Sequence, residues 1–570
     1  MEVRAFYEKN KQNIINCFSL VMVMAAISGC AKNGSANTSN QNNQNTQNSQ
    51  NNAPASGNEN KQEENNTDSQ FPISREKITL RVMAQRSDNQ PDWNDIYVWK
   101  KYEEMTNIHI DWIQVSSSDS KEKVSAAIAS NDLPDLFFRC GISAINQKLY
   151  GDQGFFVNLA ENDMLKKYAP NFWAYLQEHK DTLASVQYPD GSIYSFPQVN
   201  DGAELRVSRK LFINKNWLNN VGMELPTTLD ELYTILKAFK EKDANGNGDP
   251  NDEIPFCSMT WAGIQDVLVG AFGIQNRGVH NSLVDWDEQN NRARFIPTTE
   301  GWKEFLQYTN KLYTEGLMDQ ETFTMTTQNW ITKAADDKVG MFAYTNMAFV
   351  PSDKVENFVA LEEALEGPHG DKLWAPIRAH FHSTGAAVIT SANKYVPETL
   401  RWLDYFWTDE GTLFYHFGVE GETYVAKADG TYDWTDKIYA EMTGNKTFDE
   451  VVSSYSPYTG GNNPVIEKAP YFSGGEVQPV PAASARAMFN YGPKVYWPSF
   501  TFTLEESDEL NALETDINKY VKNARTEFVT GARSLSDWNN YVKDLEKMDV
   551  ARLLEIYTTA IERYDALLNK

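Results

Sequence analysis

The sequence predicts an α/β protein whose main sheet is largely parallel. Near the start of the folding part of the chain, three strand-like runs alternate with two helix-like stretches, and similar runs return further along. This strand–helix–strand spacing is typical of βαβ units, in which a helix joins two parallel strands. In such sheets, ligands bind beyond the carboxyl ends of the strands.

Hydrophobic periodicity defines these first elements. Residues 78–83 and 109–115 alternate apolar and polar side chains, as half-buried strands do. We expect strands at 78–83, 109–115 and 135–138, and helices at 93–106 and 121–130. The loops at the carboxyl ends of the first and third strands are then 85–93 and 139–143, and they are candidate ligand loops.

A second α/β part begins with a strand-like run at 211–215. Thr228 and Glu231 fit a capping box at the start of a helix. The leucines and phenylalanine that follow form one apolar stripe, made of Leu229, Leu232, Leu236 and Phe239. We further expect a strand at 386–390 and helices at 397–407 and 545–568.

Composition limits the classes of function. The 570 residues carry a formal net charge of −26, which disfavours nucleic acid and anionic membrane surfaces as partners. Four cysteines in a chain of this length exclude a disulfide scaffold. Whether Cys140 and Cys257 pair with each other stays open.

Residues 1–29 have the features of a signal peptide. Three basic residues precede a mostly apolar stretch at 14–27, which is too short to span a bilayer. The stretch ends in Ile27-Ser28-Gly29-Cys30, which resembles a bacterial lipobox. We therefore expect Cys30 to carry a lipid that anchors the protein to the membrane. An ordinary secretory signal followed by a chance cysteine is the alternative.

Residues 30–74 form the expected linker. Positions 31–70 contain 13 Asn and 6 Gln but no Val, Ile, Leu, Met or aromatic residue. Such a segment has no apolar surface to bury, so we expect it to be disordered. A flexible coil of this length would span about 35 Å on average and would act as a tether.

Residues 243–253 form a candidate cation loop. Asp243, Asn245 and Asn247 place oxygen atoms at positions 1, 3 and 5, and Gly248 permits a sharp turn at position 6, as in an EF-hand. Asp252 and Glu253 follow and could complete the shell, although Ile254 stands where an EF-hand has glutamate. The pattern favours structural Ca²⁺, and a solvated Asx-rich turn is the alternative.

The chain resembles the lipid-anchored extracellular solute-binding proteins of bacterial ABC importers, in particular their long oligosaccharide-type branch with calcium-containing alginate-oligosaccharide binders. The resemblance rests on the cation loop and on these segments, taken in order: Leu211 to Leu218, Leu225 to Leu232, Gly418-Val419-Glu420-Gly421-Glu422-Thr423-Tyr424, Phe528-Val529-Thr530-Gly531 and Tyr557 to Arg563.

The resemblance implies a type II periplasmic-binding-protein-like fold with a ligand cleft between two lobes. The implied first lobe takes residues 75–207 and 380–418, and the second takes 208–379 and 419–570. The implied calcium ligands are Asp243, Asn245, Asn247, Asp249, Asp252 and Glu253. The loop is one residue longer than usual, so either Asp249 or Asn251 could supply the middle oxygen.

The implied function is delivery of an oligosaccharide to an ABC transporter permease at the extracellular face of the membrane, by a monomer without enzymatic activity. Sugars need aromatic platforms for their C–H faces and polar groups for their hydroxyls. The candidate ligand residues are Gln85, Trp93, Arg139, Trp261, Tyr344, Asn346, Glu420 and Tyr424. Core packing is the competing interpretation for each aromatic residue.

Other classes stay open at this point. A surface-anchored hydrolase or lyase would need paired carboxylates, and with 78 acidic residues such a pair can always be proposed. The chain has no His-Glu-x-x-His, Gly-x-Ser-x-Gly or Walker A motif. His380 and His382 could bind zinc from one strand, but no third ligand is evident. A binder of peptides or another solute is a further alternative.

Overall fold

The computed structural model describes residues 71–87, 90–351, 353–428, 430–442, 448–458 and 461–569. They lie in one unit of the chain, Thr67–Lys570. The predicted signal peptide, Cys30 and most of the predicted linker fall outside the described residues. Within the described part, no helix is both long enough and apolar enough to cross a bilayer.

The first lobe is built on a mixed six-stranded sheet. In spatial order its strands are β14 (Ile466–Lys468), β4 (Phe196–Asp201), β11 (Phe381–Ile389), β3 (Leu136–Phe138), β1 (Ile78–Arg86) and β2 (Ile108–Ser116). Strand β1 runs parallel to β2 and β3, as the βαβ spacing predicts, while β11 runs antiparallel to β3 and β4. The carboxyl ends of β1 and β2 therefore meet at one edge.

Helices cover this sheet. They are α2 (Tyr97–Thr106), α3 (Ser120–Ser130), α4 (Ala144–Asp152), α5 (Met164–Tyr168), α6 (Pro170–Glu178), α7 (Lys180–Val186), α14 (Val396–Asp404) and α15 (Asp409–Phe417). The predicted helices at 93–106, 121–130 and 397–407 correspond to α2, α3 and α14, with short 3-10 turns at 93–95 and 405–407. These boundaries confirm the periodicity argument.

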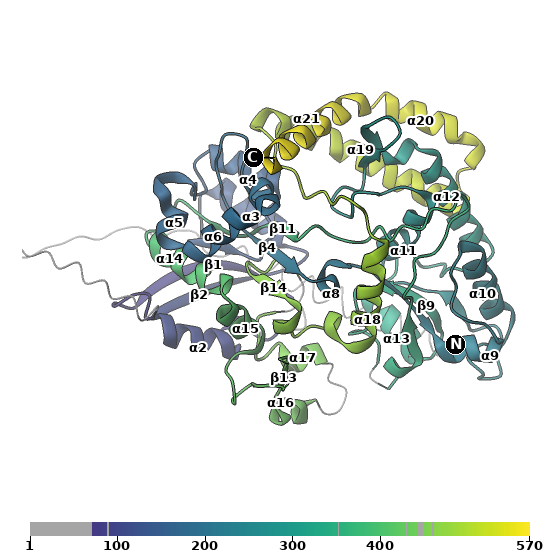
Figure 1. Cartoon of the computed structure of the whole chain (residues 1–570), viewed down its shortest axis with the longest axis horizontal. Helices are drawn as coiled ribbons and strands as arrows, with labels where there is room; N and C mark the ends of the chain where they lie inside the picture. The colour runs from purple at the N-terminus through teal and green to yellow at the C-terminus, as the bar shows by residue number, and fades with distance from the viewer. Residues whose placement is uncertain are drawn as a thin grey trace, which may run out of the picture. The chain divides into compact units, whose positions relative to one another are not determined.

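The second lobe is built on a four-stranded sheet. Its spatial order is β10 (Phe358–Ala360), β5 (Lys210–Asn214), β9 (Val339–Tyr344) and β6 (Ile254–Phe256). Around it lie α9 (Lys215–Val221), α10 (Leu229–Glu241), α11 (Trp261–Leu268), α12 (Glu300–Thr314), α13 (Thr327–Ala335) and α18 (Pro479–Met488). Helices α9 and α10 and strand β9 lie together on the right of Figure 1.

Helix α10 confirms the predicted apolar stripe, since Leu229, Leu232, Leu236 and Phe239 are all buried. The hydroxyl of Thr228 accepts a hydrogen bond from the backbone N–H of Glu231, which is half of a capping box. The other half differs from the prediction, because the Glu231 carboxylate accepts from the N–H and hydroxyl of Thr227 instead. The first turn of the helix is therefore still capped by the hydroxyl of Thr228.

The C-terminal region consists of α19 (Leu504–Thr530), α20 (Trp538–Glu546) and α21 (Val550–Leu568), which lie together at the top of Figure 1. The predicted helix at 545–568 is wrong at its start. The chain breaks between α20 and α21, where Asp549 adopts a left-handed conformation with φ 60°. Helix α19 contacts α4 and helix α21 contacts α7, so this region reaches back to the first lobe.

A small appended cluster follows α15. It contains the hairpin β12 (Tyr424–Ala426) and β13 (Tyr432–Trp434), with α16 (Asp436–Glu441) and α17 (Phe448–Val452). Strand β14 then returns to the first sheet, where it pairs with β4 and where Val465 and Ile466 join the first core. The prediction placed 419–570 in the second lobe, and it is wrong for β14. A strand of three residues is too short to show a period.

Each lobe has its own core. In the first, Trp93 is completely buried and packs its ring 4.8 Å from that of Trp112 and 5.7 Å from that of Trp99. The ring of Trp99 stacks in turn on Trp402, with 5.6 Å between centroids. These indoles come from both α2 and α14 and from β2, so they tie the helices to the sheet.

Replacing the most buried of these indoles tests this core. Trp93→Ala leaves a large cavity, so we expect the free energy of unfolding to fall by about 3–5 kcal/mol. Tyr395→Ala is the matched control, because that ring is 39% exposed, and its effect should stay within about 0.5 kcal/mol. Urea unfolding followed by circular dichroism measures both. Equal stability of the two variants would contradict the packing described.

Candidate functional site: a cavity between the lobes

A cavity of about 630 Å³ lies between the two sheets. The first lobe contributes Ser87 and Ser117, which directly follow β1 and β2, together with side chains of β4 and β14. The second lobe contributes α13 and the segment after β9. The carboxyl ends of β1 and β2 thus open into the cavity, as the sheet topology predicts. Its volume suits a small oligosaccharide.

Aromatic rings line part of the cavity. Tyr344 packs edge-on against Phe349 with 5.7 Å between ring centroids, and the guanidinium of Arg209 lies 5.7 Å from the Tyr344 ring. Across the cavity, Tyr458 packs edge-on against Phe472 with 4.6 Å between centroids. All four rings belong to the lining, so apolar faces are available from both lobes.

Four carboxyl groups also line the cavity: Asp449, Glu450, Glu467 and Glu476. Glu467 is only 1% exposed and accepts a hydrogen bond of 3.0 Å from the Nδ2 of Asn463. Its burial raises its pKa to about 8, and the charge of Glu476 adds to this shift. With this pKa, Glu467 is mostly protonated at pH 7, because burial disfavours the charged form of the carboxyl group.

Asp449 and Glu476 have a different environment. Burial, together with the charges of Glu476 and Glu450, raises the pKa of Asp449 to about 6, so this group is mostly ionised above pH 7. The Oε2 of Glu476 is buried and has no hydrogen-bond partner. Buried carboxylate oxygens normally accept hydrogen bonds, so these two groups mark a place for donors from a ligand.

Arg378 is the one basic side chain among the described lining residues. Burial lowers its pKa to about 10, and the nearby charge of Arg209 lowers it further, whereas Asp266, Glu476 and Glu467 act in the opposite direction. Asp266 lies with its Oδ2 3.8 Å from the Nε of Arg209. Two guanidinium groups therefore share these carboxyl groups at the end of the cavity.

Two of the predicted ligand residues, Tyr344 and Asn346, line the cavity. The Oδ1 of Asn346 accepts a hydrogen bond from the N–H of Ala348, and the side chain lies against Gly475. A Cβ at position 475 would lie 2.8 Å from Asn346, so glycine is needed for this close approach. The contact brings the two sides of the cavity together.

The prediction that Trp93 and Arg139 face the ligand is corrected by the structure. Trp93 is completely buried in the first core, as described above. Arg139 is also completely buried, and its Nη1 donates a 3.0 Å hydrogen bond to the carbonyl of Pro457. Its Nε donates to the carbonyl of Gly461 at 3.4 Å. Arg139 thus supports a loop beside the cavity and does not line it.

The other four predicted ligand residues also lie outside the lining. Trp261 stacks on Phe323 in the second core, and Tyr424 packs in the small appended cluster. Glu420 is exposed in the turn that precedes Tyr424. Gln85 lies closest to the site, because its Nε2 donates to the Oγ of Ser117 at 2.9 Å. The presence of an aromatic residue did not by itself distinguish a core position from a cleft position.

Sequence reasoning missed Arg378 and the four carboxyl groups. Nothing in the local sequence distinguishes Glu467 or Asp449 from the other 76 acidic residues. The glycine pair that directly precedes Glu476 is the one local feature that could have marked a loop of this kind. The remaining information is three-dimensional, since β14 and α17 reach the cavity through long connections.

The cation loop folds into a compact turn. The two carboxylate oxygens of Asp243 accept hydrogen bonds from the N–H groups of Asn247 and Gly248 at 3.0 and 2.9 Å. The Asp252 carboxylate accepts from the amide nitrogens of Asn245 and Asn247, both at 3.0 Å. An amide nitrogen and its oxygen exchange places by rotation, which would turn these two residues into oxygen ligands.

The donor set of this loop fits a hard cation. Glu253 is 3% exposed, its Oε1 accepts from the N–H of Ala244 at 2.9 Å, and its Oε2 is buried without a partner. Such an orphaned oxygen beside Asp252 suits Ca²⁺, which prefers carboxylate and amide oxygens. Among the described residues, no three His, Cys, Asp or Glu side chains are already gathered at metal-binding spacing.

The zinc alternative has little support. The Nδ1 of His380 lies 3.4 Å from the Oδ2 of Asp181, and its Nε2 lies 3.4 Å from the Nη1 of Arg206. A guanidinium beside the ring nitrogen is a poor environment for a cation. The side chain of His382 lies outside the described part of the structure.

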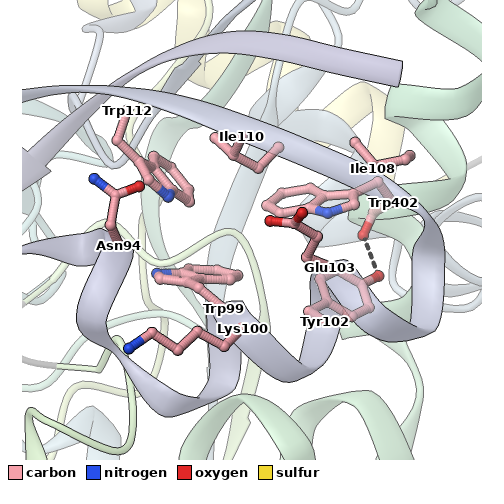
Figure 2. Close-up of a pocket in the computed structure, with 9 residues that line it drawn as sticks. All are labelled: Asn94, Trp99, Lys100, Tyr102, Glu103, Ile108, Ile110, Trp112 and Trp402. Carbon is pink, nitrogen blue, oxygen red and sulfur yellow. Dashed lines mark hydrogen bonds between the residues drawn. The ribbon is translucent and has the colours of Figure 1, made fainter. Parts of the chain in front are cut away.

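Two other hollows differ from the interlobe cavity. One, of about 40 Å³, lies between α2 and β2 and is shown in Figure 2. Its rings belong to the first core, and the Tyr102 hydroxyl donates to the Trp402 carbonyl at 2.8 Å. It is too small for a sugar. The other, of about 750 Å³, is lined by the β7–β8 hairpin (Val284–Asp287, Arg292–Phe295), by Thr298 and Thr299, and by α20 and α21.

Two α/β lobes around a polar and aromatic cavity define a type II binding-protein fold. The chain belongs to the family of bacterial extracellular solute-binding proteins, whose pattern matches residues 89–413. It is 30% identical, over 518 residues, to the fructooligosaccharide ABC transporter substrate-binding protein FusA of Streptococcus pneumoniae, with 88% of this chain and 93% of FusA covered.

Further relatives belong to the same class. The chain is 25% identical over 427 residues to the polygalacturonan/rhamnogalacturonan-binding protein YtcQ of Bacillus subtilis, with 69% of this chain and 79% of YtcQ covered. The solved structure of an EF-hand mutant of S. pneumoniae FusA in complex with fructo-nystose has a TM-score of 0.70 and 26% identity. The match covers 86% of this chain and all of the FusA chain.

The raised pKa of Glu467 predicts a specific pH dependence. The unfolded chain loses this proton near the ordinary pKa of 4.5, whereas the folded chain keeps it up to about pH 8. The free energy of unfolding therefore falls as the pH rises between these values, by at most about 1.4 kcal/mol per pH unit. Glu467→Gln removes the titration, and its amide oxygen still accepts from Asn463.

We expect the thermal midpoint of Glu467→Gln to vary less between pH 5 and pH 8 than that of the unsubstituted chain. Calorimetric scans at both pH values measure this difference. Glu300→Gln is the control, because Glu300 is exposed on α12 and should leave the pH profile unchanged. A profile of Glu467→Gln as steep as that of the control would contradict a protonated Glu467.

Proposed function

We propose that this chain is a lipid-anchored binding protein that captures an oligosaccharide between its lobes and presents it to the permease of an ABC importer. The observation that carries the proposal is the interlobe cavity, which combines rings from both lobes with carboxylates that have no donor. The ligand named for FusA supports a sugar as the occupant.

Different cavity residues would bind different parts of the sugar. Tyr344 and Phe472 offer rings to the apolar C–H faces of a sugar, and Asp449 and Glu476 accept hydrogen bonds from its hydroxyls. A ligand that touches both lobes stabilises the conformation in which they lie closer together. The permease would then recognise that conformation. Cys30 would hold the protein at the membrane through the predicted tether.

An enzymatic function is the second candidate, and one observation favours it. A protonated carboxyl group, Glu467, and ionised carboxylates share the cavity, which is the arrangement that glycoside hydrolysis uses. The relatives are binding proteins, so we place transport first.

Binding and turnover can be separated with one ligand. We expect nystose to quench the tryptophan fluorescence of the full chain saturably and to be recovered uncleaved after prolonged incubation. Tyr344→Ala should weaken binding by about tenfold or more, because ring stacking on a sugar is lost. Chromatography of the recovered sugar measures cleavage. Fructose among the recovered sugars would contradict the proposal of transport without catalysis and would favour hydrolysis.

We further propose that Asp243, Asn245, Asn247, Asp249, Asp252 and Glu253 bind a structural Ca²⁺. The ion would join the two ends of the loop that connects α10 to β6, and so hold the second sheet against its helices. The EF-hand named for FusA supports this assignment.

Calcium should stabilise the chain through this loop. At tenfold excess over its dissociation constant, Ca²⁺ should raise the free energy of unfolding by about 1.4 kcal/mol, because it binds the folded form alone. We expect Asp252→Asn to abolish this increase. Asp287→Asn, at the end of strand β7, should retain it. Denaturation with EGTA or with excess CaCl₂ makes the comparison, and a calcium response that persists in Asp252→Asn would refute the site.

A further inference from the structure

We propose that the interlobe cavity accepts uncharged oligosaccharides and excludes oligosaccharides of uronic acids. The inference rests on the proposed function, since it names the class of sugar that the same cavity takes. Relatives with fructooligosaccharide and with polygalacturonan in their names leave the class open. We therefore infer the class of sugar from the cavity residues of this chain.

The charge of the lining favours an uncharged ligand. The described lining residues carry four carboxyl groups and one guanidinium. Protonation of Glu467 still leaves the charges of Asp449 and Glu476 beside the single lining guanidinium, that of Arg378. A uronic acid brings a further carboxylate into a partly dehydrated space, where like charges repel more strongly than in water. An uncharged sugar brings no such cost.

The hydrogen-bond acceptors of two lining carboxylates also favour a ligand rich in hydroxyls. No described residue donates a hydrogen bond to the carboxylate of Asp449, and the Oε2 of Glu476 is likewise without a donor. Two of the lining amides are already engaged, because Gln198 Nε2 donates to Asn200 Oδ1 and Asn200 Nδ2 donates to the carbonyl of Leu205. The carboxylates of Asp449 and Glu476 therefore need donors from a ligand, which hydroxyls supply and carboxylates do not.

One arginine, Arg378, belongs to the lining and is a candidate partner for a uronate. Burial lowers the pKa of Arg378 to about 10, while the charges of Asp266 and Glu476 act on the same guanidinium, so a uronate there would also meet those carboxylates. Arg209 donates to the hydroxyl of Thr345 beside the cavity, and Arg139 donates to the carbonyls of Pro457 and Gly461. The same guanidinium of Arg378 also disfavours a cationic sugar at this end of the cavity.

The test is calorimetric titration of the full chain with matched tetrasaccharides. The uncharged probes are nystose, xylotetraose, mannotetraose and the fully methyl-esterified tetragalacturonate, and the charged probes are tetragalacturonate and tetramannuronate. We expect at least one uncharged probe to bind and every charged probe to bind at least about a hundredfold more weakly than the best of them. A uronate bound within tenfold of the best uncharged probe would overturn the inference.

If no probe binds, the proposed oligosaccharide function fails, and the inference fails with it. If uronates alone bind, the function survives and the inference is wrong. The two failures are therefore distinguishable from the same set of titrations.

Two variants identify the cause of the discrimination. Asp449→Asn and Glu476→Gln each remove one negative charge, so each should weaken the best uncharged probe by about tenfold and narrow the gap to its charged counterpart. Glu300→Gln, exposed on α12, should change neither value. Thermal midpoints verify that the variants fold. Unchanged discrimination in folded Asp449→Asn and Glu476→Gln would overturn the assignment to these carboxylates.

Discussion

Backbone pairing between two crossing segments determines where the cavity lies. Ser208 donates its N–H to the carbonyl of Pro376 at 2.8 Å, and Arg378 donates its N–H to the carbonyl of Arg206 at 2.9 Å. One segment follows β4 and the other precedes β11, so the pairing joins these two neighbouring strands of the first sheet to the second lobe. It also places the Arg378 side chain at the cavity, beside the carboxyl groups of β14 and its neighbours.

Burial of carboxyl groups then determines the chemistry of the two candidate sites. Where burial is nearly complete, as for Glu467, the group keeps its proton even though the amide of Asn463 donates a hydrogen bond to it. Where donors are absent, as at Glu476 and at the Oε2 of Glu253, an orphaned oxygen remains. Native proteins seldom leave such atoms unsatisfied, so each of these positions implies an external partner. A sugar hydroxyl suits the oxygen of Glu476, and a cation suits that of Glu253.

The sequence carries enough information for the local elements but not for the cavity. Alternation at 78–83 and the stripe of α10 depend on neighbours along the chain, and both predictions are confirmed. Trp93 was expected at the cleft because it follows a strand end, yet Trp99 and Trp112 enclose it. Its burial depends on residues that come together only in the folded lobe, where large aromatic rings favour the core.

The same limit applies to long connections. Strand β14 has three residues and pairs with β4, more than 260 positions earlier in the chain, so no local pattern could assign it to the first lobe. The break before α21 is also hidden, because its apolar periodicity continues across Asp549, which adopts a left-handed conformation. Resemblance to a family supplied the two-lobed architecture, and only the three-dimensional arrangement supplied Asp449, Glu467 and Glu476.

In the proposed function, lobe motion and ligand chemistry are linked through these carboxylates. Narrowing the cavity removes water from Asp449 and Glu476, and dehydration of an ionised group without a donor is strongly unfavourable. Narrowing also brings like charges closer together, which adds repulsion in a medium of lower dielectric constant. A ligand rich in hydroxyls replaces the lost water and so removes most of the cost of dehydrating these carboxylates. The narrowed conformation is therefore favoured when such a ligand is present, and the same carboxylates that select the sugar couple its binding to the movement of the lobes.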